Sequence, residues 1–91
     1  MAQIIVTLKI MPENPDVEFS AIEAQARAKI TEFGGRVARV EHEPIAFGLK
    51  ALKMMFTMDE DKGSTEDMEN DIATVAGVNS VQVIDVRRTM G

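Results

Sequence analysis

The chain has 91 residues, 45% hydrophobic and 27% charged, with a formal net charge of −5 and no cysteine. This length suits one core, so we expect residues 1–91 to form a single domain. The 10 Lys and Arg residues are spread along the chain, which argues against direct nucleic-acid binding because that needs a clustered basic surface. No apolar run approaches the ~20 residues that span a bilayer, so we expect no membrane partner. The N-terminus shows no signal pattern, and the cytoplasm is the default compartment.

The first half of the chain predicts a strand, a helix and a second strand. Residues 3–11 alternate in polarity and are rich in β-branched side chains, as in a half-buried strand. Asn14 and Asp16 are candidate N-caps for a helix that starts near Asp16 or Val17, because their side chains can accept hydrogen bonds from free backbone N–H groups. A Gly-Gly pair at 34–35 ends this helix, and residues 36–43 form the second strand.

A third strand and an acidic loop follow. Residues 51–58 alternate again, and one face of this strand, which we expect to be buried, carries Leu52, Met54, Phe56 and Met58. We expect the methionines to fill the core, and an adaptable binding surface is the alternative. The run at 59–63 contains three acids, but it lacks the ligand spacing of a calcium-binding loop. We interpret it as a solvated connection.

The chain ends with a second helix and a fourth strand. Ser64 or Thr65 caps the helix, with Asp67 as the acidic member of a capping box. In the strand, residues 80–88, the apolar phase changes after Val83, which indicates either that both faces are partly covered or that a bulge intervenes.

This order of elements is typical of the ferredoxin-like, or split βαβ, fold. The fold is an α+β sandwich in which a four-stranded antiparallel sheet carries two helices on one face. Right-handed crossovers predict the spatial strand order 4-1-3-2.

No catalytic or metal-binding constellation stands out. The only histidine, His42, lies in a predicted strand, where it cannot gather the several donors of a zinc site or the partners of a catalytic triad. The glycines match neither a P-loop nor a dinucleotide fingerprint. We therefore expect no metal, no cofactor and no bond chemistry of the chain's own.

Residues 44–52, Pro-Ile-Ala-Phe-Gly-Leu-Lys-Ala-Leu, join two predicted strands and place an aromatic ring beside a glycine where a turn would normally be polar. Pro44 suits the end of an edge strand, and Gly48 permits a left-handed backbone. Two hypotheses remain open for Phe47. Its side chain either folds back to cap one end of the core, since most apolar side chains are buried, or is an aromatic anchor for a partner.

Arg87 and Arg88 are adjacent cations near the end of the chain. From the residues alone, a solvated terminus is the simpler interpretation. Because side chains alternate along a strand, we expect the two arginines to point to opposite faces, so that only one can face a given partner.

Residues 44–52, the acidic run at 59–61 and the Val-Asn-Ser-Val-Gln-Val run at 78–83 together resemble the guanine-nucleotide-exchange domain of translation elongation factor 1-beta, in its short archaeal form. The resemblance covers essentially the whole chain. It implies a non-enzymatic factor that promotes exchange of GDP for GTP on elongation factor 1-alpha during protein biosynthesis, and we expect a monomer when it is free. The alternative is a small ferredoxin-like regulatory or ligand-binding domain unrelated to GTPases.

The resemblance also implies roles for individual residues. Phe47 matches the aromatic residue that the family inserts into its partner. The neighbours expected to share this contact are Pro44, Ala46 and Gly48. Arg88 falls where eukaryotic relatives have a lysine that reaches toward the magnesium and phosphate site, and Arg87 is the alternative candidate. The sequence departs from the family here, because arginine is planar and prefers forked contacts whereas lysine is a compact charge.

Overall fold

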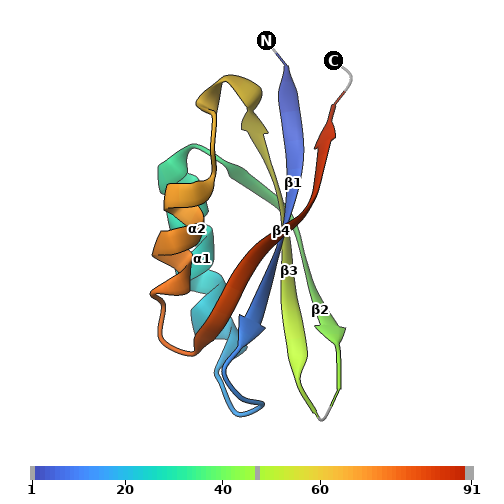
Figure 1. Ribbon diagram of the computed structural model, residues 1–91, viewed down its shortest axis with the longest axis vertical. Helices are drawn as coiled ribbons and strands as arrows, with labels where there is room; N and C mark the ends of the chain where they lie inside the picture. The colour runs from blue at the N-terminus through green and yellow to red at the C-terminus, as the bar shows by residue number, and fades with distance from the viewer. Residues whose placement is uncertain (1, 47, 90–91) are drawn as a thin grey trace.

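The computed structural model describes residues 2–46 and 48–89. Four strands and two α-helices follow one another in the predicted order, with a short 3-10 turn, η1, before the second helix (Figure 1). The bounds are β1 Gln3–Pro12, α1 Phe19–Phe33, β2 Arg36–Pro44, β3 Lys50–Asp59, η1 Glu60–Lys62, α2 Glu66–Ala73 and β4 Val78–Arg88. In the described part of the chain, neither helix has the length and apolar character that a membrane span requires.

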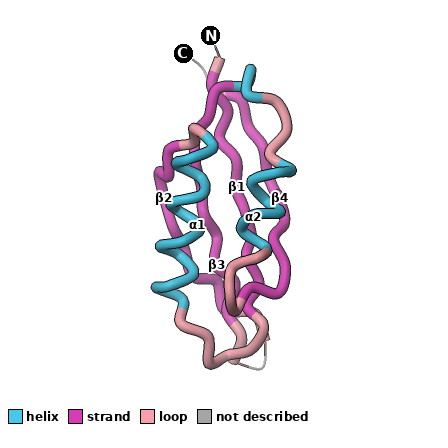
Figure 2. Tube along the Cα trace, turned by 90° about the vertical axis from the view of Figure 1, so that its left-hand side faces the viewer, coloured by secondary structure: helices cyan, strands magenta, loops and turns pink. Residues whose placement is uncertain are grey.

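The strands form one antiparallel sheet in the order β2-β3-β1-β4, so the predicted fold class and strand order are confirmed. The central strand β1 pairs with β3 on one side and β4 on the other. Both helices lie on the same face of the sheet, as Figure 2 shows. The molecule measures 42 × 21 × 17 Å, and its long axis follows the strands (Figure 1).

The core lies between the helices and the sheet, because alternate residues of each strand point to that side. In β3 the core residues are no more than 1% exposed: Leu52, Met54, Phe56 and Met58. They pack in one cluster with helix residues that include Ile22, Ala26, Ile30, Met68 and Ile72. The expectation that Met54 and Met58 fill the core is confirmed.

Helix α1 begins later than the sequence pattern predicts. Its first residue is Phe19 and its N-cap is Glu18, so the predicted start near Asp16 or Val17 is too early. The Asn14 Oδ1 atom accepts a hydrogen bond from the Asp16 N–H at 2.9 Å. This contact closes a local turn, because a short polar side chain stabilises a turn as readily as a helix start.

Helix α2 starts where expected but without the expected capping box. Its N-cap is Thr65, whose hydroxyl donates to the Glu69 carboxylate at 2.6 Å instead of accepting from the helix backbone. The Ser64 hydroxyl accepts from the Glu66 N–H at 3.1 Å. Glu69, one turn into the helix, is therefore the acid that engages the cap residue, and the assignment of this role to Asp67 is wrong.

Strand β4 contains a bulge, which confirms one of the two explanations for its change of apolar phase. The neighbouring β1 residues Thr7 and Leu8 lie opposite Asp85 and Val83, so Ile84 is the extra residue. The bulge moves the later even-numbered residues to the helix-covered side. It thereby decides which way the side chains at the end of β4 point.

The Gly-Gly pair between α1 and β2 lets the chain turn close to the core. Gly34 has a φ of +106°, in the left-handed region that favours glycine, and its N–H donates to the Thr31 carbonyl at 3.0 Å. A Cβ atom on Gly35 would lie 2.8 Å from both Ile30 Cγ2 and Phe56 Cδ2. Any larger residue at position 35 would therefore push the start of β2 away from the core.

Candidate functional site

The β2–β3 turn, residues 45–49, joins the edge strand β2 to β3 at one end of the molecule (Figure 1). The Ile45 N–H donates to the Leu49 carbonyl, and the Leu49 N–H donates to the Ala46 carbonyl, each at 2.9 Å. Gly48 has a φ of +78°, and a Cβ built on it would meet no atom within 4 Å. Backbone hydrogen bonds and a glycine conformation therefore define this turn.

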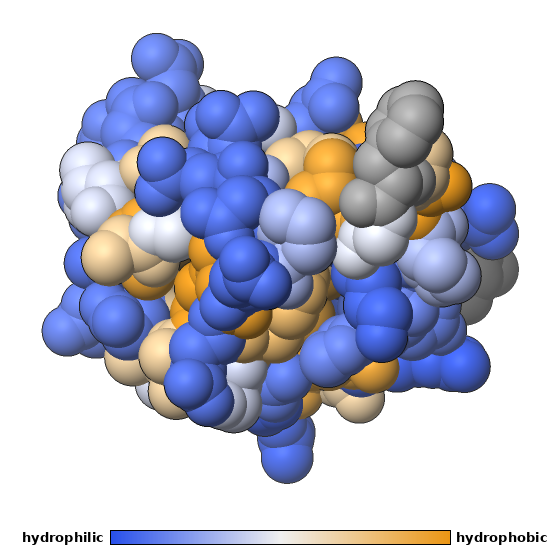
Figure 3. Space-filling view, turned by 90° about the horizontal axis from the view of Figure 1, so that it is seen from below, coloured by the Kyte–Doolittle hydropathy of each residue, from blue (hydrophilic) through white to orange (hydrophobic). Residues whose placement is uncertain are grey.

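The turn is both exposed and apolar. Ile45 is 43% exposed, and Pro44, Ala46 and Gly48 are exposed as well. A hollow of about 220 Å³ is lined by Pro44, Ile45, Ala46, Gly48, Leu49 and Lys50. Figure 3 views this end of the molecule and shows apolar surface among hydrophilic side chains. Apolar side chains gathered at a loop tip favour a contact with another protein over a solvated connection.

Phe47 lies outside the described residues, so neither hypothesis for its side chain is tested by the structure. The described residues on either side of it, Ala46 and Gly48, are exposed. The role of Phe47 stays a prediction.

Arg88 lies at the last position of β4, opposite Ile4 of β1. Ile4 is two residues before the buried Val6, so it shares the helix-covered side of the sheet, and Arg88 points to the same side. The Arg88 Nη2 donates to the Glu60 carboxylate at 2.8 Å. The guanidinium is therefore held over the sheet's end by the first residue of η1.

Arg87 points to the opposite, helix-free face. It lies opposite Ile5, and its Nε atom donates to the Asp85 carboxylate at 3.0 Å. The two arginines thus face different sides of the sheet, as the alternation along a strand predicts.

The two parts of the predicted site lie at opposite ends of the sheet. Pro44 pairs with Lys50 at one end of β3, and Arg88 shares a row with Ile4 and Met58 at the other. The eight steps from Lys50 to Met58 correspond to about 26 Å at a strand rise of about 3.3 Å per residue. The structure therefore does not bring the turn and the terminal arginines together, and a partner that contacts both must extend along the molecule.

An ion pair joins β2 and β3 next to the turn, on the helix-free face. The Lys53 ammonium donates to the Glu43 carboxylate at 2.8 Å. This hydrogen bond, together with the attraction between the charges, holds the pKa of Glu43 below its ordinary value of 4.5. The same two causes raise the pKa of Lys53 above 10.5. Both groups are therefore charged at neutral pH.

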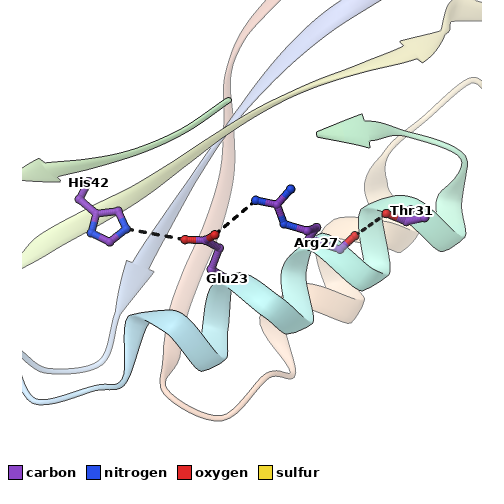
Figure 4. Close-up of polar contacts among 4 residues, drawn as sticks. All are labelled: Glu23, Arg27, Thr31 and His42. Atoms are coloured by element: carbon purple, nitrogen blue, oxygen red, sulfur yellow. Dashed lines mark hydrogen bonds and ion pairs between the residues drawn. The ribbon is translucent and has the colours of Figure 1, made fainter. Parts of the chain in front are cut away.

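His42 faces α1 from the edge strand (Figure 4). Its Nε2 atom lies 3.8 Å from the Glu23 carboxylate, and its ring centroid lies 5.5 Å from that of Phe19. Glu23 also accepts from Arg27 at 3.3 Å, and the Arg27 carbonyl accepts from the Thr31 hydroxyl at 2.8 Å. Within residues 2–46 and 48–89, no three metal-ligating side chains converge. His42 therefore links β2 to α1.

Glu60 is the contact residue that sequence reasoning missed. The sequence predicts a solvated connection at 59–63, but the acids of this run have separate tasks. The Asp59 carboxylate accepts from the Asp61 N–H at 3.0 Å and so caps η1, while Glu60 binds Arg88. Glu60 and Arg88 are 28 residues apart in the sequence, so no local spacing signals their contact. Only the strand order, with β1 between β3 and β4, places them within reach of each other.

Residues 5–89 match the family described as the EF-1 guanine nucleotide exchange domain, and the chain belongs to this family. It is 39% identical over 90 residues to elongation factor 1-beta of Methanothermobacter thermautotrophicus and 42% identical over 90 residues to that of Methanobrevibacter smithii. Each alignment covers 99% of this chain and 100% of the relative. Elongation factor 1-beta of Staphylothermus marinus is 38% identical over 89 residues, with 97% of this chain and 98% of the relative covered. The family resemblance inferred from the sequence is thus confirmed.

Solved structures share the fold at low sequence identity. The ACT domain from GTP pyrophosphokinase of Chlorobium tepidum superposes with a TM-score of 0.61 at 17% identity, covering 90% of this chain and 99% of that one. The C-terminal domain of the MgtC protein from Mycobacterium tuberculosis gives a TM-score of 0.64 at 12% identity, covering 97% of this chain and 88% of that one. At these identities the likeness shows the fold alone.

Proposed function

We propose that this chain promotes the exchange of GDP for GTP on elongation factor 1-alpha during translation elongation. The observation that carries the proposal is the match of residues 5–89 to the EF-1 guanine nucleotide exchange domain. An exposed apolar turn at one end of the sheet and an exposed arginine at the other support it. We place the activity in the cytoplasm, with the chain acting as a monomer.

The β2–β3 turn is the docking part of the proposed site. Phe47 enters an apolar pocket of the partner, and the exposed Ile45 and the hollow beside it add apolar contact area. Hydrogen bonds join Ile45 to Leu49 and Leu49 to Ala46, so these residues of the turn lose little conformational freedom on binding, which favours affinity.

Arg88 is the part that acts on the nucleotide site. A guanidinium brought close to the magnesium ion and the phosphates competes with the metal for its acidic and phosphate ligands. This competition weakens the binding of GDP to the partner. The turn lies about 26 Å away by the strand rise, so the two contacts reach different parts of the partner. Docking at the turn then leaves Arg88 free to approach the nucleotide.

This mechanism forms and breaks no covalent bond. A factor that binds the nucleotide-free partner more tightly than the GDP-bound partner must lower the affinity for GDP by the same ratio. Such a factor accelerates nucleotide release but does not determine whether GDP or GTP binds next. An excess of GTP over GDP then sets the direction of exchange.

Binding measurements with purified elongation factor 1-alpha test the proposal. We expect the chain to bind the nucleotide-free partner at least about 10-fold more tightly than the GDP-bound partner, and GDP affinity to fall by the same factor in its presence. Equal affinity for the two forms would contradict the proposal, because such a ligand cannot displace the nucleotide however tightly it binds.

A further inference from the structure

Glu60 joins the acidic run after β3 to the arginine at the end of β4. Its carboxylate accepts from Arg88 Nη2 at 2.8 Å. We propose that Glu60 is a positioning residue that holds the Arg88 guanidinium ready for the partner's nucleotide site. This inference rests on the exchange function proposed above.

The contact spans a full strand of the sheet. Arg88 lies on β4 and Glu60 follows β3, with β1 between them, so the ion pair crosses two strand spacings, or about 10 Å. A long arginine can cover this distance only when its side chain extends over β1 on the helix-covered side. The bond to Glu60 therefore selects one extended direction for a side chain that otherwise has many rotamers.

Both ends of the bridge are anchored to Ala2 and Gln3, where β1 begins. The Glu60 N–H donates to the Ala2 carbonyl at 3.1 Å. On the other side, the N–H and the hydroxyl of Thr89 donate to the Gln3 carbonyl at 2.9 Å and 3.0 Å. The backbones that carry Glu60 and Arg88 are thus fixed relative to each other, which makes the carboxylate a defined support for the guanidinium.

The bridge leaves most of the guanidinium available. The Arg88 side chain is 70% exposed, whereas that of Glu60 is 33% exposed. A guanidinium carries five N–H donors, and the bond to Glu60 uses only the Nη2 group. An exposed ion pair of this kind adds little to folding stability, so the contact is better explained by the orientation it gives to Arg88.

Exchange kinetics on elongation factor 1-alpha test this role with Glu60→Gln, which keeps the side-chain shape but removes the charge. We expect the maximal rate of GDP release to fall about 2- to 10-fold, the cost of ordering one long side chain. The half-saturating concentration should stay nearly unchanged, because docking rests on the β2–β3 turn. Asp61→Asn in the same turn is the matched control and should exchange at the wild-type rate.

A double-mutant cycle shows whether Glu60 acts through Arg88. In an Arg88→Ala background, Glu60→Gln should have no further effect. The proposal is overturned if Glu60→Gln matches or exceeds the wild-type rate, or if it slows exchange equally in the Arg88→Ala background. If Arg88→Ala exchanges normally while the wild type is active, the role proposed for Arg88 fails. If the wild type does not stimulate release, the proposed function itself fails.

A spectroscopic measurement tests the bridge without the partner. We expect ¹⁵N relaxation of the Arg88 Nε–H group to show a more ordered side chain in the wild type than in Glu60→Gln, with the difference shrinking from about 0.05 M to about 0.5 M salt. Equal order in the two proteins at low salt overturns the positioning role, whatever the exchange assay shows.

Discussion

Arg87 and Arg88 are consecutive in β4, yet their guanidinium groups bind carboxylates on opposite faces of the sheet. Arg88 reaches Glu60 at 2.8 Å on the helix-covered side, and Arg87 reaches Asp85 at 3.0 Å on the helix-free side. The bulge at Ile84 sets this assignment, because it fixes the phase of the strand's last residues. A partner's nucleotide site can therefore face only one of the two arginines.

We predict that Arg88→Ala slows GDP release from elongation factor 1-alpha by about 10- to 100-fold, the value of a charge-assisted hydrogen bond. Arg87→Ala, the matched control, should keep the wild-type rate. Arg88→Lys should retain much of the activity if the positive charge is what matters. An inactive Arg87→Ala with a normal Arg88→Ala would assign the role to Arg87 instead.

Phe47→Ala should impair exchange while leaving folding stability nearly unchanged. The side chain is proposed to contact the partner, and the residues on either side of it are exposed. Urea denaturation measures the stability, and GDP release measures the function. A loss of about 3–5 kcal/mol in the free energy of unfolding, the usual cost of truncating a buried phenylalanine, would place Phe47 in the core.

Gly35→Ala should destabilise the fold by about 1–3 kcal/mol, as overpacking of a tight core usually does. The added Cβ would lie 2.8 Å from Ile30 Cγ2 and from Phe56 Cδ2, and both of these side chains are fully buried. Urea denaturation monitored by circular dichroism gives the change. A loss below about 0.5 kcal/mol would mean that the turn after α1 can shift at little cost.

The Glu43–Lys53 pair predicts a dependence of stability on acid pH. The folded-state pKa of Glu43 lies below its ordinary value of 4.5, so its ionised form stabilises the folded state above that value. This stability is lost as the pH falls through the folded-state pKa. Lys53→Met removes the partner of Glu43, so the stability advantage of the wild type over the variant should shrink between neutral pH and about pH 3.

Denaturation of both proteins at the two pH values measures this change. Glu43→Gln is the control, because in that background Lys53→Met should have the same effect at both pH values. An advantage of the wild type over Lys53→Met that does not change with pH would show that the pair contributes nothing through its charge.

Periodic patterns in the sequence predict the fold well, but they predict the contacts of the site poorly. Alternation in residues 51–58 correctly placed Met54 and Phe56 in the core, because one face of a strand is buried along its whole length. The start of α1 was mispredicted, since Asn14 can close a turn or cap a helix and the local sequence does not distinguish them. The bridge from Glu60 to Arg88 depends on sheet register between distant segments, which no local pattern contains.

The sequence names the candidate site residues, whose roles stay predictions, but it contains no signal for how far apart they lie in the fold. The family motif at 44–52 identified the turn, and its exposed apolar residues and hollow agree with a docking surface. Its separation from Arg88 follows only from the pairing of Pro44 with Lys50 and of Ile4 with Met58 and Arg88. The full length of β3 therefore separates two features that the sequence presents as one site.

The most direct measurement of the proposed function is the release of a fluorescent GDP analogue from elongation factor 1-alpha in the presence of excess GTP. The chain, added at about one hundredth of the partner's concentration, should accelerate release over many turnovers, because an exchange factor is not consumed. A Phe47→Ala, Arg88→Ala double variant should lose this acceleration while remaining folded. Release that stays at the spontaneous rate with the wild-type chain would contradict the exchange function and favour a ferredoxin-like regulatory or ligand-binding domain.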